Sequence, residues 1–216
     1  MQPTRREMLA SAFALPLSFS PASAQIIHDH TLLSEESAKG FLFLLCNVDV
    51  PLIILPAAQT ISWHLAFRLR HAALTGSWIL IESGLCFEAA SNWKHLRRVL
   101  REAFHLEIEE PLKVRDHYIR FEWPQKGMVR TFEAVTPVTC APTELIATFN
   151  GCAVGARRSM GRGGVIFLGS MVGPALAAEE REAHAIGNGM VQHVIPKELA
   201  GHSSPHLLKS VRYSDH

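Results

Sequence analysis

Several polar side chains that could bind a ligand or move a proton come directly after apolar runs of the sequence. A carboxyl group can act as a general acid or base, and a thiol becomes a nucleophile once its pKa is lowered. In open α/β sheets, such groups gather outside the carboxyl ends of the strands, where ligands bind. The candidates for a shared pocket are Asp29, Gln59, Glu82, Ser83, Cys86 and Ser170. Of these, Glu82 and Cys86 are the candidates for catalysis.

Each candidate also has a purely structural interpretation. Glu82 could be a buried carboxylate paired with an arginine, or the cap of a helix. Ser83 and Ser170 could satisfy turn amides, and Cys86 could be a small core residue, as buried cysteines often are. The sequence alone does not decide between these roles.

The cysteines and histidines form no recognisable metal site. The spacing of the four cysteines matches no zinc pattern, and the twelve histidines are scattered without an H-E-x-x-H motif. We therefore predict no metal and no cofactor. Cys140 and Cys152 flank a predicted hairpin and could form a disulfide in an oxidising compartment.

The elements that position these groups alternate between helices and apolar strands. Apolar runs at 51–55, 78–81 and 165–168 are typical of strands buried on both faces. Helical patterns precede or follow them at 34–46, 60–74, 93–104 and 179–194. This alternation predicts a parallel α/β sheet. Short strands at 117–123, 129–138, 144–149 and 153–157, with an Asn150-Gly151 hairpin turn, form an antiparallel segment inserted near 115–160.

Two further patterns have simple interpretations. The glycine-rich stretch 161–164 lacks the Lys-Ser/Thr end of a phosphate loop and precedes a strand, so it predicts a hairpin turn. The basic residues of the 93–104 helix, which are Lys94, Arg97, Arg98 and Arg101, are interpreted as a solvated surface.

The N-terminus has the order of a secretory signal. Arg5 and Arg6 are followed by an apolar stretch, 10–19, and then by small residues that end at Ala24. The paired arginines resemble the twin-arginine class, and cleavage after Ala24 is expected. We predict a signal peptide at 1–24, a periplasmic α/β domain at 25–195 and a loose tail at 196–216.

Charge and hydropathy limit the partners of the exported chain. The full chain has a formal charge of +1, and loss of Arg5, Arg6 and Glu7 with the signal brings this close to zero. A neutral chain lacks the electrostatic footprint of a nucleic-acid-binding protein. No later segment is long and apolar enough to span a bilayer. We therefore expect a small molecule or a periplasmic protein as partner, with no stable membrane insertion.

Three segments resemble class I glutamine amidotransferase-like domains, particularly the ThuA-like and biotin-protein-ligase N-terminal-like members. Residues 52–58 resemble the strand and LPGG turn of that superfamily, and 76–84 its strand leading to the nucleophile. Residues 161–170 resemble the late strand that normally delivers the catalytic histidine. The resemblance implies a flavodoxin-like sheet with helices on both faces.

The departures from that superfamily concern its catalytic residues. One alignment places Glu82 at the nucleophile position of the G-x-C-x-G elbow. A second places Cys86 there, with Glu88 in place of the last glycine. We prefer the first, because it keeps a natural strand length. No His-Pro-Glu follows the late strand, so glutamine hydrolysis is not expected. The leading hypothesis is an exported, non-catalytic binding or assembly module, and the alternative is a divergent hydrolase or transferase that uses Cys86 or Glu82.

Overall fold

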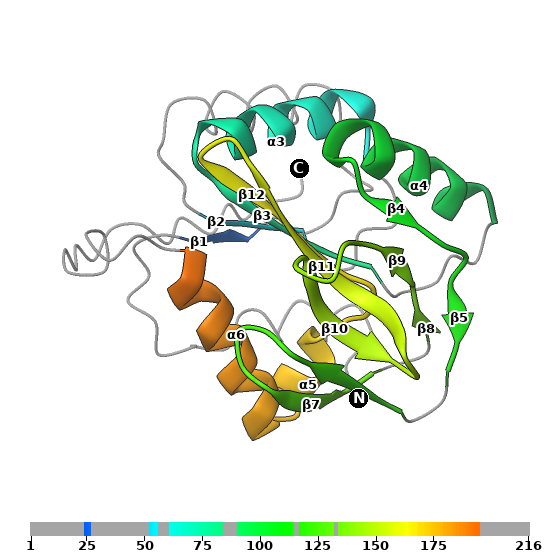
Figure 1. The fold of residues 1–216 in the computed structure, drawn as a ribbon, viewed down its shortest axis with the longest axis vertical. Helices are drawn as coiled ribbons and strands as arrows, with labels where there is room; N and C mark the ends of the chain where they lie inside the picture. The colour runs from blue at the N-terminus through cyan, green and yellow to red at the C-terminus, as the bar shows by residue number, and fades with distance from the viewer. Residues whose placement is uncertain are drawn as a thin grey trace, which may run out of the picture.

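The computed structural model describes residues 24–26, 52–55, 61–83, 90–114, 117–131 and 134–194. It is an α/β structure in which helices lie on both sides of one large sheet (Figure 1). The predicted helix at 34–46 and tail at 196–216 lie outside these residues. So do residues 1–23 of the predicted signal, whose last residue, Ala24, begins the first strand.

The large sheet has eight strands, and their order is β1-β2-β3-β12-β11-β10-β6-β7. The first four run parallel to one another, and the remaining neighbours pair antiparallel. The strands are β1 (Ala24–Ile26), β2 (Leu52–Leu55), β3 (Trp78–Glu82), β12 (Gly163–Leu168), β11 (Cys152–Met160), β10 (Leu145–Phe149), β6 (Tyr118–Phe121) and β7 (Gly127–Arg130). Two short antiparallel pairs, β4 (Glu107–Ile108) with β9 (Val138–Thr139) and β5 (Leu112–Lys113) with β8 (Ala134–Val135), stand beside it.

The central strands are apolar, apart from Glu82 at the end of β3, because helices cover both of their faces. In β2, Ile53 and Leu55 belong to one core cluster, while Leu52 and Ile54 belong to the other. All six residues of β12 are buried. Successive side chains of a strand point to opposite faces, so an uninterrupted apolar run is what two covered faces require. The predicted run at 165–168 is confirmed as the main part of β12.

Helices α3 (Trp63–Thr75) and α4 (Ala90–Phe104) cover one face of the sheet. Ser62 is the N-cap of α3, and its Oγ accepts a hydrogen bond from the Leu65 N–H at 3.2 Å. Gly76 ends α3 with a φ of 136°, a conformation that a side chain would disfavour. Helices α5 (Gly173–Ala177) and α6 (Arg181–Val194) cover the other face.

The antiparallel half continues the sheet directly. Asn150 and Gly151, both at positive φ, turn β10 into β11, as predicted. The predicted hairpin turn between β11 and β12 consists of residues 161 and 162, the first half of the 161–164 stretch, and the Arg162 N–H donates to the Leu74 carbonyl of α3 at 3.2 Å. The single strand predicted at 129–138 is wrong, because the chain there forms β7, β8 and β9, which pair with three different partners.

Two carboxylates occupy the open edge of the sheet at β7. The Met128 N–H donates to Glu182 Oε2 at 2.5 Å, and the Arg130 N–H donates to Glu180 Oε2 at 3.4 Å. An unpaired strand edge would otherwise present free N–H groups to another strand. Glu182 in the first turn of α6 and Glu180 just before the helix therefore protect this edge from strand addition.

Candidate functional site

A cluster of buried polar side chains lies where β3 and β12 end. Within the described ranges, the buried polar residues are Glu82, Ser83, Thr131, Thr136 and Ser170, with exposed fractions of 0 to 2%. Glu82 ends β3 opposite Leu168, the last residue of β12, and the Ser83 N–H donates to the Leu168 carbonyl at 2.7 Å. This is the carboxyl edge of the parallel strands, where the sequence placed the pocket.

Glu82 is a carboxyl group enclosed on the apolar side of the sheet covered by α5 and α6. Strand alternation places it on the same face as Leu80, and the Val172 N–H donates to its Oε1 at 3.3 Å. Burial disfavours the charged form and raises the pKa of Glu82 to about 8, although the Val172 hydrogen bond acts in the opposite direction. Glu82 is therefore mainly a protonated carboxylic acid at pH 7.

The four hydroxyl groups of the cluster bond in two pairs. Ser83 Oγ lies 3.2 Å from Thr136 Oγ1, and Ser170 Oγ lies 2.5 Å from Thr131 Oγ1. Both pairs are buried, and a hydroxyl can donate and accept at the same time. Each serine comes from a strand end of the parallel half, and each threonine comes from the segment after β7. The pairs therefore join the two halves of the sheet.

Gly169 allows this crossing segment to approach β12. A Cβ at Gly169 would stand 1.9 Å from the Thr136 carbonyl oxygen and 3.0 Å from that of Val154. The Thr136 N–H donates to the Gly169 carbonyl at 2.6 Å, and the Gly169 N–H donates to Val154. No side chain fits in this space, so glycine is required at the point where the polar cluster forms.

The structure brings together three of the predicted site residues, Glu82, Ser83 and Ser170, at one end of the sheet. The other three, Asp29, Gln59 and Cys86, lie outside the described residues. Thr131 and Thr136 were missed, because nothing in the local pattern of the 129–138 stretch distinguishes them from strand threonines. Glu82 accepts from a backbone N–H, so the predicted arginine partner is replaced by Val172.

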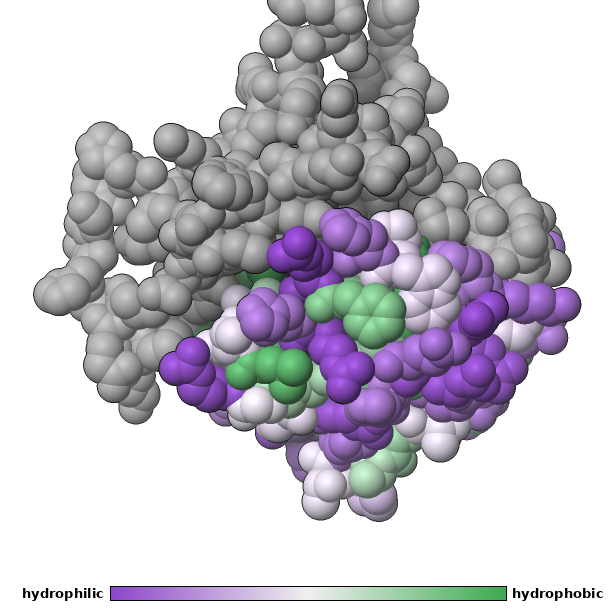
Figure 2. Space-filling view, turned by 90° about the horizontal axis from the view of Figure 1, so that it is seen from above, coloured by the Kyte–Doolittle hydropathy of each residue, from purple (hydrophilic) through white to green (hydrophobic). Residues whose placement is uncertain are grey.

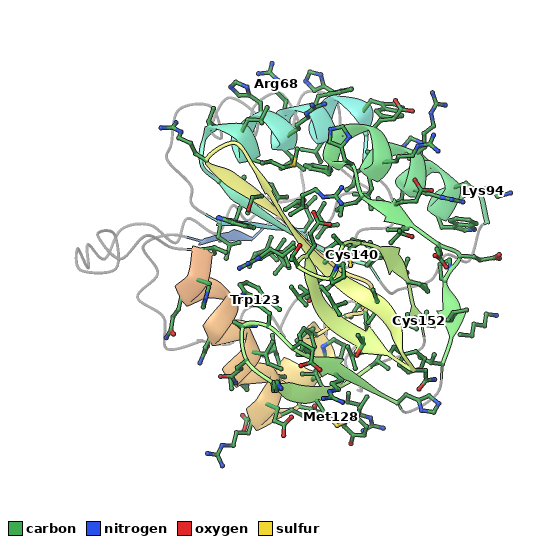
Figure 3. All side chains as sticks on the ribbon, viewed as in Figure 1. Arg68, Lys94, Trp123, Met128, Cys140 and Cys152 are labelled. Carbon is green, nitrogen blue, oxygen red and sulfur yellow. The ribbon has the colours of Figure 1, made fainter. Side chains whose placement is uncertain are left out.

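The described cysteines form no disulfide, and the described residues contain no metal site. Cys140 and Cys152 are free thiols, half-buried and exposed respectively (Figure 3). Burial and the nearby Glu144 raise the pKa of the Cys140 thiol. Across the described ranges, no group of three histidine, cysteine or acidic side chains is placed to hold a metal ion. In the same ranges, no helix is long and apolar enough to cross a membrane.

Comparison with known proteins finds similarity of fold only. No protein-family model and no curated protein matches the chain. Among solved structures, a β-galactosidase from Rahnella sp. R3 matches with a TM-score of 0.54 at 12% identity, over 80% of this chain and 31% of that one. An exo-β-1,4-mannosidase from an Opitutaceae bacterium matches with a TM-score of 0.50 at 11% identity, over 88% of this chain and 38% of that one.

A smaller solved protein matches over most of its length. The cytoplasmic protein STM1381 of Salmonella typhimurium LT2 has a TM-score of 0.56 at 12% identity, over 90% of this chain and 89% of that protein. The chain thus spans about a third of the glycosidases and nearly all of this protein. At such identities the matches define the α/β fold of the chain and assign it no activity.

These matches correct the expected family. The segments 52–58, 76–84 and 161–170 predicted a class I glutamine amidotransferase-like domain, whereas the similar solved structures are mainly β-galactosidases. The short motifs encode buried parallel strands with tight turns, and those physical features are not specific to one superfamily. The resemblance was therefore wrong as a family assignment.

The buried carboxyl group predicts a pH-dependent stability. Because the folded pKa of Glu82 lies above the unfolded value, the folded state holds the proton more tightly, and stability should fall as pH rises from about 4.5 to 8. One pKa unit corresponds to about 1.4 kcal/mol, so the full shift corresponds to a loss on the order of 5 kcal/mol. Urea unfolding of the wild type and Glu82→Gln at several pH values measures it.

Glu82→Gln keeps the acceptor for Val172 and removes the titration, so its stability should be flatter across this window. Glu110→Gln, at an exposed position, is the matched control and should follow the wild type. Equal slopes for the wild type and Glu82→Gln would show that Glu82 is not the titrating group.

The hydroxyl pairs predict energetic coupling between distant segments. Thr136→Val preserves shape but leaves the buried Ser83 hydroxyl without this partner, which should cost about 1–3 kcal/mol. Ser83→Ala together with Thr136→Val should cost less than the sum of the single changes, with a coupling of at least about 0.5 kcal/mol. Chemical denaturation of the four proteins gives this cycle. Thr139→Val, at an exposed threonine, should be nearly neutral, and additive effects of Ser83 and Thr136 would contradict the pairing.

Proposed function

We propose that the chain is an exported, non-catalytic module that binds a ligand or assembles with a partner in the periplasm. The observation that supports this proposal is the closure of the polar cluster. Glu82, Ser83 and Ser170 are each 2% exposed or less. The serine hydroxyls bond to threonines of the same chain, and Glu82 accepts from a backbone N–H. A catalytic group must contact its substrate, whereas these side chains are buried and hydrogen-bonded to other groups of the same chain.

The composition of the cluster also argues against glycoside hydrolysis by these groups. That reaction generally needs two carboxyl groups on opposite sides of the scissile bond. The buried polar cluster contains one, Glu82, and its other members are hydroxyls. The similarity to β-galactosidases therefore supports a shared fold without a shared mechanism at this cluster.

The distribution of the fold among the matched structures is consistent with a module. A similar arrangement makes up about a third of the glycosidase chains and nearly all of the Salmonella protein. The parallel half, with helices on both faces, is the part for which we propose a flavodoxin-like arrangement. A unit that occurs both alone and within larger chains is suited to binding or assembly.

Export is the part of the proposal that the N-terminal sequence supports. The full-length chain expressed in a bacterium with twin-arginine export should be recovered from the periplasm, with Gln25 as its first residue by mass spectrometry. Replacement of Arg5 and Arg6 by lysine should retain the precursor in the cytoplasm. Export of that variant at the wild-type rate would exclude the twin-arginine route, and a cytoplasmic wild type would exclude export.

The module proposal predicts no turnover by the purified 25–216 chain. Nitrophenyl β-galactoside and β-mannoside, with ester and amide substrates, should be hydrolysed no faster than in buffer. Isothermal titration against periplasmic sugars and acids tests binding in parallel. Sustained hydrolysis proportional to protein concentration would refute the non-catalytic proposal.

The alternative is a divergent hydrolase or transferase, and the raised pKa of Glu82 is the observation that favours it. A carboxylic acid that stays protonated near neutral pH can serve as a general acid. If any substrate is turned over, Glu82→Gln should abolish the activity, whereas Glu110→Gln should retain it. Cys86, which lies outside the described residues, is tested by alkylation: a thiol that reacts no faster than a free thiol is no activated nucleophile.

A further inference from the structure

The outer faces of α3 and α4 concentrate the positive charge of the molecule. These two helices contain six basic side chains and a single acidic one, Glu102, although the whole chain has a formal charge of only +1. The rest of the chain is therefore net acidic. The basic residues are Arg68, Arg70, Lys94, Arg97, Arg98 and Arg101. The near-neutral total conceals a strongly cationic surface.

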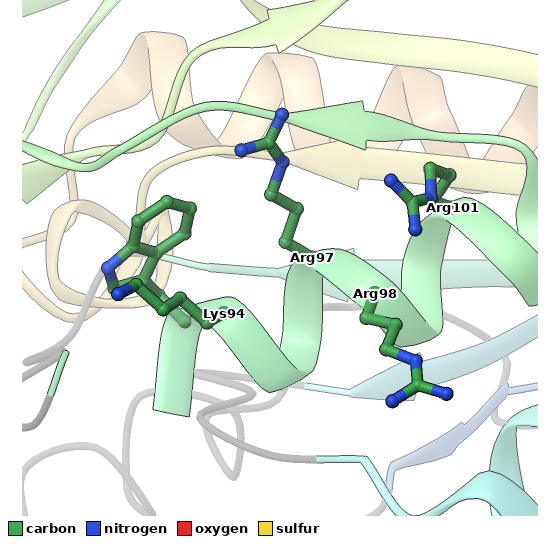
Figure 4. Close-up of a pocket in the computed structure, with 5 residues that line it drawn as sticks. Lys94, Arg97, Arg98 and Arg101 are labelled. Atoms are coloured by element: carbon green, nitrogen blue, oxygen red, sulfur yellow. The ribbon is translucent and has the colours of Figure 1, made fainter. Parts of the chain in front are cut away.

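On α4 the cations line a shallow pocket. Its walls are Trp93, Lys94, Arg97, Arg98 and Arg101, which project from successive turns of the helix (Figure 4). The Arg97 Nε donates to Glu107 Oε1 at 2.7 Å, and Arg98 lies 3.3 Å from Glu102. Both arginines are thus held in place on the helix surface, with the exposed Lys94 and Arg101 beside them.

Aromatic rings connect this basic surface to α3. The Trp63 ring stacks on Phe67 with a centroid distance of 6.0 Å, and the Arg98 guanidinium lies 5.4 Å from the Trp63 ring. Phe67 is 50% exposed and Leu74, two turns further along α3, is 44% exposed. Figure 2 looks down on this side of the molecule and shows a few hydrophobic side chains surrounded by hydrophilic ones.

The β11–β12 turn extends the same surface. The backbone bond between Arg162 and the Leu74 carbonyl places another exposed cation beside the C-terminal end of α3. The result is a layer of two adjacent helices, each roughly 20 Å long at 1.5 Å per residue, with exposed apolar side chains among cations. Arg68 and Lys94 project from its outer side (Figure 3).

We propose that this α3–α4 surface docks on an anionic phospholipid bilayer. A bilayer offers a plane of phosphates to the lysines and arginines and an apolar layer just beneath them for Phe67 and Leu74. A soluble polyanion would pair with the cations but would gain nothing from the two exposed apolar side chains. The binding is peripheral and does not depend on the proposed function. The opposite helix layer contributes Glu180 and Glu182 at the β7 edge, so the charge asymmetry also orients the molecule.

Vesicle sedimentation tests the proposal with the 25–216 chain. The protein should sediment with vesicles of phosphatidylglycerol mixed with phosphatidylcholine and remain in solution with phosphatidylcholine alone. Added salt should weaken the binding. Lys94→Glu with Arg101→Glu should lower the affinity at least about tenfold, because each basic residue contributes about one kcal/mol near such a surface and 1.4 kcal/mol is tenfold. Phe67→Ser should weaken the binding without changing its salt dependence.

Arg181→Glu is the control, since Arg181 is exposed on α6, across the sheet, and undergoes the same reversal of charge as each of the two α4 residues. It should bind vesicles as the wild type does, and circular dichroism should show every variant folded. Equal binding to both kinds of vesicle would overturn the proposal. So would a loss with Arg181→Glu as large as with the α4 variant. Binding to heparin or polyphosphate without binding to vesicles would also overturn it and would assign the surface to a soluble polyanion.

Discussion

The rest of the structure depends on the burial of β12 between two helix layers and two kinds of neighbouring strand. This strand pairs parallel with β3 on one side and antiparallel with β11 on the other. Its side chains alternate between the core under α3 and α4, with Val165 and Phe167, and the core under α5 and α6, with Ile166 and Leu168. Every backbone and side-chain direction around β12 is therefore occupied by protein. Close backbone contacts at both ends, at Gly163 and Gly169, are what allow the neighbouring segments to fit.

Such complete enclosure explains the chemistry of the polar cluster. Polar groups at the end of a fully covered strand lose their hydrogen bonds to water. Their burial costs little free energy only if protein groups replace those hydrogen bonds. The serine hydroxyls form hydrogen bonds with threonines of the crossing segment. Glu82 is neutralised by protonation, and its Oε1 accepts a hydrogen bond from the Val172 N–H. The same enclosure that raises the pKa of Glu82 keeps solvent away from it. A carboxyl group so placed stabilises a particular arrangement of strand ends. Both a structural role and a general-acid role are compatible with a protonated Glu82, so access of substrate to the group distinguishes the two roles.

The sequence predicted the parts of this arrangement that local pattern determines. Apolar runs indicated β2, β3 and β12, and Asn150-Gly151 indicated the β10–β11 hairpin, because burial on two faces and positive φ leave direct traces in residue type. They also indicated that Glu82, Ser83 and Ser170 would share one edge. Thr131 and Thr136 could not be found in this way, since their partners are 39 and 53 residues away and meet them only through the strand order of the sheet. The family assignment was wrong for a related reason. Short strand-and-turn motifs reflect the burial of strands, and unrelated families share them.

The net charge of the chain likewise did not predict how charge is distributed over its surface. A near-neutral total argued against a nucleic-acid partner, and the basic residues of α4 were interpreted as a solvated surface. That interpretation treats each cation separately. The sheet, however, sets α3 beside α4 and brings Arg162 to the end of α3, while Glu182 of α6 and the preceding Glu180 are used at the β7 edge on the other side. Attraction to an anionic surface depends on the local potential within a Debye length, about 10 Å at moderate salt, and so on the charges of one face rather than on their sum over the chain.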